Sequence, residues 1–182
     1  MKELTFITSH AKKAEELSQH LDFPVVHHKL DLPEIQSLDP SEVVIAKAKG
    51  AYRLLNRPVL VEDYSITFSA LGALPGPLIK WFLQEMQIEG ICRLLDNYPT
   101  RQATARTCFA LYDKQGVHVF DGTITGTITT EPRGDHGFGM DAIFIPDGSK
   151  LTWGEMGKED QVVYSLRRIG LKKLEAYLRN QN

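Results

Sequence analysis

Two long β-favouring runs separated by a turn restrict the fold of this chain more than any other feature. They cover residues 103–112 and 117–129 and flank Asp113-Lys114-Gln115-Gly116, a spacing that predicts a β-hairpin. Shorter strand and helix patterns follow one another in the rest of the chain. This mixture predicts an α/β protein with an elongated mixed β-sheet and flanking helices.

The N-terminal third predicts a strand at residues 4–8, a helix at 12–21 and a second strand at 25–28. Asp39-Pro40-Ser41-Glu42 then places a capping Asp before a Pro at the first helical position, with a Glu three residues after the cap. A helix should begin there. Its apolar face is formed by Val44, Ala48, Ala51 and Leu55.

Residues 59–63 predict a buried strand that ends in two acids, Glu62 and Asp63. An amphipathic run through Trp81, Phe82 and Met86 follows a Pro/Gly-rich turn. A Gly-rich loop at 133–139 precedes a short predicted strand at 143–145. The closing helix has an apolar face made of Val163, Leu166, Gly170, Leu174, Tyr177 and Leu178.

Composition narrows the class of protein. A chain of 182 residues fits one domain, or two closely packed lobes, and a net charge of -2 argues against duplex nucleic acid as the main partner. The two cysteines form no CxxC pair and no zinc-binding cluster, which favours a reducing, cytoplasmic setting. No window has the apolar length of a membrane helix, and the N-terminus does not resemble a signal peptide.

The segment from Thr8 to Lys13 joins a predicted strand to a predicted helix. It offers hydroxyl groups, free backbone N–H groups and a cation, which together suit a phosphate. It lacks the glycines of a Walker A loop. The alternative interpretation is a helix cap followed by solvated lysines.

Three acids form the second candidate site. Glu34 lies in a loop, and Glu62 and Asp63 come where a strand is predicted to end. Clustered carboxylates repel one another, and Mg²⁺ relieves that repulsion while it bridges phosphate oxygens. The ends of strands in open α/β sheets are also where ligands bind. Exposed loop acids are the alternative.

The third candidate is Phe138-Gly139-Met140-Asp141, where a glycine allows close approach of the backbone and an acid can accept hydrogen bonds from a base edge. A turn that leads into a strand is the alternative. By themselves, Lys47, Lys80 and Arg167 read as solvated charges on helices.

Taken in order, these segments resemble the inosine triphosphate pyrophosphatase family over nearly the whole chain. Residues 8–13 are similar to the family's Thr-Gly-Asn-x-x-Lys phosphate loop, and Leu32-Pro33-Glu34 matches its metal-binding acid. Further matches are Val61-Glu62-Asp63, the stretch 74–82, Pro132-Arg133-Gly134, Phe138-Gly139-Met140-Asp141, Pro146-Asp147-Gly148, Glu155-Met156 and Ser165-Leu166-Arg167.

The resemblance implies a nucleoside triphosphate pyrophosphatase that converts non-canonical purine triphosphates, such as those of inosine and xanthosine, to the monophosphate and pyrophosphate. Asp63 would orient or deprotonate the attacking water. Mg²⁺, with Mn²⁺ as the alternative, would be held by Glu34, Glu62 and Asp63. The implied substrate-binding residues are Thr8, Ser9, His10, Lys13, Lys47, Tyr64, Lys80, Phe138, Gly139, Met140, Asp141, Gln161, Leu166 and Arg167.

Several departures from the family pattern affect the nucleobase site. His10 replaces an Asn, Met140 replaces an aromatic residue, Gln161 replaces a Lys and Leu166 replaces a His. The 6-oxo group of hypoxanthine accepts hydrogen bonds, and loss of one donor in a buried pocket costs about 1–3 kcal/mol. We therefore expect less selectivity for inosine than the family norm, or a preference for another base.

The resemblance also implies a single domain over residues 1–182, with two lobes around a central nucleotide cleft and a homodimeric assembly. The phosphate loop and the C-terminal helix would share one lobe, and the hairpin around Asp113 would belong to the other. Three alternatives stay open: a pyrophosphatase for another modified or pyrimidine nucleotide, a non-catalytic nucleotide-binding protein, and a nucleic-acid-binding module. The third is disfavoured because the sequence has no basic stripe interleaved with aromatic residues. Retention of Glu34, Glu62 and Asp63 speaks against the second.

Overall fold

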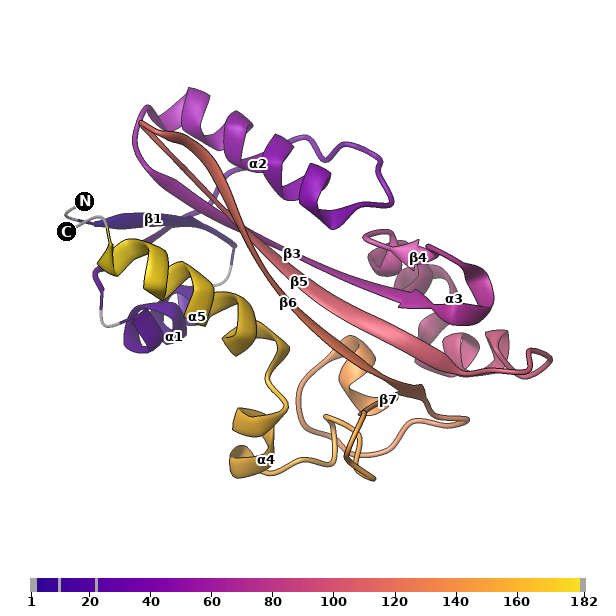
Figure 1. The fold of residues 1–182 in the computed structure, drawn as a ribbon. Coiled ribbons are helices and arrows are strands. Elements are labelled where there is room, and N and C mark those ends of the chain that lie inside the picture. The colour runs from indigo at the N-terminus through magenta and orange to yellow at the C-terminus, as the bar shows by residue number, and fades with distance from the viewer. Residues whose placement is uncertain (1–2, 10, 22, 181–182) are drawn as a thin grey trace. The chain divides into compact units, whose positions relative to one another are not determined.

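A computed structural model of the chain describes residues 3–9, 11–21 and 23–180. These residues form a seven-stranded sheet in the order β2-β1-β3-β5-β6-β7, with β4 beside β3 (Figure 1). β1 is parallel to β2 and β3, whereas β4 and β7 are antiparallel to their neighbours, so the predicted mixed sheet is confirmed. The strands are β1 (Leu4–Ile7), β2 (Val25–His28), β3 (Val59–Phe68), β4 (Pro75–Gly76), β5 (Gln102–Asp113), β6 (Gly116–Ile128) and β7 (Phe144–Pro146).

Helices flank the sheet, and their bounds follow the apolar periods of the sequence. They are α1 (Ala11–Leu21), α2 (Pro40–Leu55), α3 (Ile79–Leu94), α4 (Lys158–Val163) and α5 (Leu166–Arg179), with short 3-10 turns η1 (Ser69–Leu71) and η2 (Gly139–Ala142). Within the described residues, no helix combines the length and the apolar character needed to cross a bilayer.

The start of α2 is fixed by polar residues. The Asp39 carboxylate accepts a hydrogen bond from the backbone N–H of Ser41 at 2.9 Å, as the predicted N-cap requires. The carboxylate of Glu42 accepts a hydrogen bond from the hydroxyl of Ser37 at 2.6 Å, and Ser37 Oγ accepts the Asp39 N–H at 3.0 Å. Ser37 therefore links the predicted capping residue Glu42 to the backbone of Asp39.

The chain forms two compact units. Unit 1 comprises Met1–Asp63, Thr107–Gly122 and Ile169–Asn182, and unit 2 comprises Tyr64–Arg106 and Thr123–Arg168. In unit 1, α1 and α5 lie side by side on one face of the strands and α2 covers the other face (Figure 1). Unit 2 has its own core. Its buried members include Ile66, Phe68, Ile91, Leu95, Ile128, Met140, Ile143, Phe144 and Leu166.

The hairpin of β5 and β6 forms as predicted, but its tip lies in unit 1 together with α5. The prediction that the hairpin and the C-terminal helix belong to different lobes is therefore wrong. Phe109, Leu111 and Phe120 of the hairpin share a buried cluster with Leu171 and Leu174 of α5. A strand pattern shows that an apolar face exists, but it does not show which helix covers that face.

β3 does not end at the two acids. It continues to Phe68, because Ile66 and Phe68 keep the period of two and are both fully buried in the core of unit 2. The acids instead follow the part of β3 that is paired with the neighbouring β1, since the register places Thr5 beside Val59 and Phe6 beside Leu60.

The closing helix is also different from the prediction, because it is interrupted between α4 and α5. The backbone oxygen of Tyr164 accepts a hydrogen bond from Trp153 Nε1 at 3.0 Å, and Ser165 Oγ accepts the N–H of Arg168 at 3.3 Å. Ser165 thus caps a new helix. Val163, which was expected on the apolar face, lies on α4 and is exposed. The short strand β7 begins one residue later than predicted.

Candidate functional site

Glu62 and Asp63 occupy adjacent positions of β3 and therefore face opposite sides of the sheet. The two preceding residues show which side is which. Leu60 packs in the cluster that contains α1 and α5, whereas Val61 packs against Val44 and Ala48 of α2. Because side chains alternate, Glu62 faces the α1 side and Asp63 faces the α2 side.

Lys47 joins two acids on the α2 side of unit 1. Its ammonium donates to Asp63 Oδ1 at 2.9 Å and also forms an ion pair with Glu34 Oε1. The side chains of Lys47 and Asp63 are only 16% and 14% exposed, whereas that of Glu34 is half exposed. The helix, the strand and the loop thus bring together three of the predicted site residues.

The charges of this cluster are not balanced. Burial raises the pKa of the Asp63 carboxyl, Lys47 opposes the rise, and the neighbouring charges of Glu34 and Glu62 add to it. Burial acting alone would lower the pKa of Lys47, but the charge of Asp63 and the hydrogen bonds to Glu34 and Asp63 leave it raised. A single ammonium serves two carboxylates, so the cluster retains an attraction for a further cation.

Glu62 pairs with a different lysine on the other side of the sheet. Its Oε2 lies 3.9 Å from the ammonium of Lys13 on α1. Of the predicted phosphate loop, Ser9 is exposed and Thr8 donates its backbone N–H to the oxygen of His28 at 3.1 Å. His10 lies outside the described residues. The two lysines predicted to bind phosphate in unit 1 therefore each hold one acid of β3.

The Lys47 cluster has some of the features that a divalent cation requires. Asp63 Oδ2 is buried and has no hydrogen-bond partner among the described atoms, which leaves an anionic oxygen available to a ligand. Carboxylate oxygens of this kind are what Mg²⁺ prefers. In the described part of the chain, however, no group of three or more acidic, His or Cys side chains converges as a ready metal cage. Asp63 and Glu34 thus supply carboxylate oxygens that suit a divalent cation, but they do not by themselves form a complete set of ligands.

In unit 2, Asp141 closes a tight turn that follows the Gly-rich loop. Its Oδ2 accepts the backbone N–H of Phe138 at 2.9 Å, and its own N–H donates to the oxygen of Phe138 at 3.3 Å. Burial raises the pKa of the Asp141 carboxyl, and the hydrogen bond from Phe138 opposes that rise. Gly137 has a φ of 78°, and a Cβ there would lie 2.0 Å from Asp141 Oδ2, so this turn requires glycine.

The other residues of the predicted nucleobase site differ in how far their side chains are exposed. Phe138 is 79% exposed, whereas Met140 and Leu166 are buried in the core of unit 2. Gln161 is on α4, where its Nε2 donates to the backbone oxygen of Met156 at 3.2 Å. Among the described residues of the predicted nucleobase site, Phe138 is the aromatic residue with an exposed ring for stacking. Gly139 begins η2, and Arg167 lies in the first turn of α5.

Tyr64 and Lys80 are also in unit 2. The hydroxyl of Tyr64 is buried without a hydrogen-bond partner, and burial together with the charge of Asp141 raises its pKa. Lys80 is exposed on α3, and its ammonium lies 5.4 Å from the ring centroid of Trp81. Neither residue is engaged in an ion pair in the structure described here.

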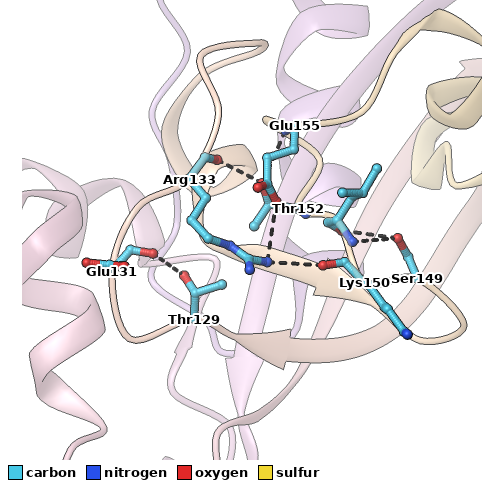
Figure 2. Close-up of polar contacts among 8 residues, drawn as sticks. Thr129, Glu131, Arg133, Ser149, Lys150, Thr152 and Glu155 are labelled. Carbon is cyan, nitrogen blue, oxygen red and sulfur yellow. Dashed lines mark hydrogen bonds and ion pairs between the residues drawn. The ribbon is translucent and has the colours of Figure 1, made fainter.

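A polar network that the sequence analysis gave no role lies next to the Gly-rich loop (Figure 2). Glu155 Oε2 accepts the backbone N–H of Thr152 at 2.9 Å and lies 3.3 Å from Arg133 Nη2. The N–H of Glu155 in turn donates to Thr152 Oγ1 at 3.2 Å. The signal was present in the sequence, because Thr-x-x-Glu is the spacing of a reciprocal capping box.

Comparison with known proteins agrees with this architecture. A model of the Ham1 family matches residues 4–177. The inosine triphosphate pyrophosphatase of Yarrowia lipolytica is 41% identical over 96% of this chain and 95% of its own length. That of Kluyveromyces lactis is 39% identical over 98% and 96%.

Solved structures extend the likeness to the fold. The Staphylococcus aureus Ham1 protein has a TM-score of 0.89 and 25% sequence identity, with all of both chains covered. Both the sequence matches and the structural match run over nearly the whole chain, so they do not depend on a single motif. The motifs of this chain resemble those of the inosine triphosphate pyrophosphatases, and the matches identify the chain as a member of the Ham1 family.

Proposed function

We propose that this protein hydrolyses non-canonical purine nucleoside triphosphates, such as inosine or xanthosine triphosphate, to the monophosphate and pyrophosphate. One observation carries the proposal. In a chain of the Ham1 family, Lys47 bridges Glu34 and Asp63, and one oxygen of Asp63 is buried with no hydrogen-bond partner among the residues that the structure describes. Such an oxygen can accept a proton from water or hold a cation, and both are useful in phosphoryl transfer.

Asp63 orients the water that attacks the α-phosphorus and accepts its proton, and pyrophosphate leaves. Its raised pKa suits this role, because a carboxylate becomes a better base as its pKa rises. Lys47 holds Asp63 in place and faces the substrate's negative charge. Lys13, Lys80 and the loop residues Thr8, Ser9 and His10 bind the remaining phosphate oxygens.

Glu34 and Asp63 would hold Mg²⁺, with Mn²⁺ as a substitute, and Glu62 would add to the negative potential beside them on β3. The cation would supply neutralisation of the phosphate charge and activation of water. The support for this assignment is the charge imbalance of the cluster and the unpartnered oxygen of Asp63. Lys47 would then exchange part of its pairing with the acids for contact with phosphate.

The nucleobase is bound by the turn from Phe138 to Asp141, with Tyr64 beside it. Phe138 offers a stacking surface and Asp141 accepts hydrogen bonds from the base edge. The proposed nucleobase-binding residues also include Met140, Gln161, Leu166 and Arg167. Met140 and Leu166 are buried in the core, so they support the turn more than they read the base. This supports a base preference broader than that of the family pattern.

The protein is further proposed to act as a homodimer in the cytoplasm. The reducing compartment is consistent with Cys92 and Cys108, which are both buried and form no disulfide in the described part of the chain. Light scattering of the purified chain measures the assembly directly, and a mass of one chain would contradict the dimer.

The test of the function is pyrophosphate release with Mg²⁺ from the triphosphates of inosine, xanthosine, deoxyadenosine, guanosine and a pyrimidine nucleoside. Asp63→Asn should lower kcat by about a hundredfold or more, because the proton acceptor is lost. It should leave nucleotide binding, measured by calorimetry, largely intact. Asp96→Asn is the control, since Asp96 is an exposed acid that pairs with Arg101.

Three outcomes would change the conclusion or part of it. Binding without pyrophosphate release from any triphosphate would indicate a nucleotide-binding protein and contradict the enzyme. Preferred turnover of a pyrimidine triphosphate would keep the reaction but replace the substrate class. A preference of about a thousandfold for inosine triphosphate would refute the broadened base site, because such a ratio needs dedicated hydrogen bonds to the base.

A further inference from the structure

The turn proposed to bind the nucleobase is part of a loop that packs along a second loop of unit 2. Backbone hydrogen bonds tie the two together. The N–H of His136 donates to the oxygen of Gly154 at 3.0 Å, and the N–H of Gly154 donates to the oxygen of Asp141 at 2.7 Å. Between these contacts lie Phe138 and Gly139, so the second loop sets the position of the first.

The contact is too close for side chains at its centre. A Cβ on Gly134 would lie 2.1 Å from the carbonyl carbon of Gly154, and one on Gly154 would lie 2.9 Å from the oxygen of Arg133. The loops therefore touch through their backbones. Small shifts of one loop must be passed on to the other, because no flexible side chain separates them.

Side chains lock this contact at one end (Figure 2). Thr152 is fully buried, and its hydroxyl donates to the backbone oxygen of Arg133 at 2.8 Å. Glu155 lies 3.3 Å from Arg133 Nη2 and accepts the N–H of Thr152. Arg133 Nη2 also lies 3.2 Å from the oxygen of Lys150, to which it donates. Glu155 is thus the anion that holds both loops.

We infer that Glu155 is a positioning residue for nucleobase binding, which acts through Arg133 and Thr152 on the turn from Phe138 to Asp141. The inference rests on the proposed function, because it takes that turn as the base-binding element. The Glu155 side chain itself does not contact the turn; it fixes the backbone that carries it. Base affinity, and not the chemical step, should depend on its charge.

The decisive variant is Glu155→Gln, which keeps the size of the side chain and removes its charge. Arg133 would lose its anionic partner, and its Nε is already buried without a hydrogen bond in the described structure. We expect KM for inosine triphosphate to rise about tenfold while kcat stays within about twofold, since base contacts are made equally in the ground and transition states.

Inorganic tripolyphosphate separates base binding from phosphate binding, because it carries no base. Its inhibition constant against inosine triphosphate hydrolysis should stay within about twofold of wild type in Glu155→Gln. A protein that is merely less stable would behave differently. It would contain fewer active molecules, so the apparent kcat would fall and KM would not change.

Matched variants control for the change of charge and for folding. Glu131→Gln makes the same substitution in unit 2 at an exposed acid for which no side-chain contact is found in the described structure, and it should leave KM unchanged. Thr152→Val removes the hydroxyl that holds Arg133 and should raise KM as Glu155→Gln does. Thr152→Ser restores that hydroxyl and should restore KM.

Amide hydrogen exchange without nucleotide gives a readout that does not need turnover. The N–H groups of Arg133, His136 and Gly154 should exchange faster in Glu155→Gln than in Glu131→Gln, because the loops separate more often. An active wild type with an unchanged KM in Glu155→Gln would overturn the inference and leave the proposed function standing. An inactive wild type would contradict the proposed function. Equal amide exchange rates in Glu155→Gln and Glu131→Gln would then overturn the inference independently.

Discussion

The hydroxyl of Tyr64 is buried beside the charge of Asp141 and has no hydrogen-bond partner among the described atoms. An unsatisfied buried hydroxyl costs about 1–3 kcal/mol. Tyr64→Phe should therefore leave the free energy of unfolding unchanged or raise it by about 1 kcal/mol in the absence of nucleotide. The same change should lower kcat/KM for a 6-oxopurine triphosphate, because the ligand loses a donor. Chemical denaturation and steady-state kinetics measure the two effects.

The control for this prediction is Tyr98→Phe, at a tyrosine that is 43% exposed. Its free energy of unfolding should stay within about 0.5 kcal/mol of wild type, as is usual for surface changes. A clear loss of stability in Tyr64→Phe would mean that the hydroxyl has a partner within the protein. A stable variant with unchanged kinetics would show that the hydroxyl does not meet the substrate.

At the scale of elements, the pairing of β6 with β7 depends on a glycine. Gly126 is opposite Pro146, and a Cβ on it would lie 2.2 Å from the oxygen of Ile145 and 2.7 Å from Phe144 Cζ. Neither backbone nor a fully buried ring can move away easily. Gly126→Ala should lower the free energy of unfolding by about 3 kcal/mol, the upper part of the range for overpacking.

Gly157→Ala is the comparison for this strand pair. A Cβ at Gly157 would meet nothing within 4 Å, and its φ of -72° suits any residue. Urea denaturation of both variants should show a loss only for Gly126→Ala. If the two variants had equal stability, the close approach of β7 to β6 would not exist in solution.

At the scale of the whole molecule, acid should weaken the fold through Glu155. The hydrogen bond from Thr152 is the main cause of a Glu155 pKa below its ordinary value of 4.5, and Arg133 adds to it. An acid with a lowered pKa stabilises the folded state at pH above the unfolded value. That contribution disappears as pH falls through the lower, folded value.

Thermal unfolding of wild type and Glu155→Gln between neutral and acid pH tests this linkage. Wild type should have the higher Tm at neutral pH, and the difference should shrink below about pH 4, where the carboxyl becomes protonated in both states. Glu131→Gln should run parallel to wild type throughout. A difference that persists unchanged in acid would mean that the Glu155 charge does not contribute to stability.

Local patterns predicted much of the fold. The capping Asp39 set the start of α2, and periods of two and 3.6 located the strands and helices of unit 1. These features depend on neighbours in sequence, so they are readable without a structure. The extent of β3 and the break before α5 were not, because they depend on tertiary contacts. Phe68 packs in a core with residues far along the chain, and the backbone oxygen of Tyr164 accepts a hydrogen bond from the side chain of Trp153.

Local motifs and periodicity were enough to indicate the family, the mixed sheet and the kinds of residue that a triphosphate would need. Which of these residues lie in contact depends on tertiary packing. Lys47 reaches Asp63 and Glu34 because α2 packs on one face of β3, and strand alternation sends Glu62 to Lys13 on the other. Likewise, the Arg133–Glu155 pair exists because two glycines let their loops touch. Contacts between distant residues follow from packing, and packing depends on the whole chain at once.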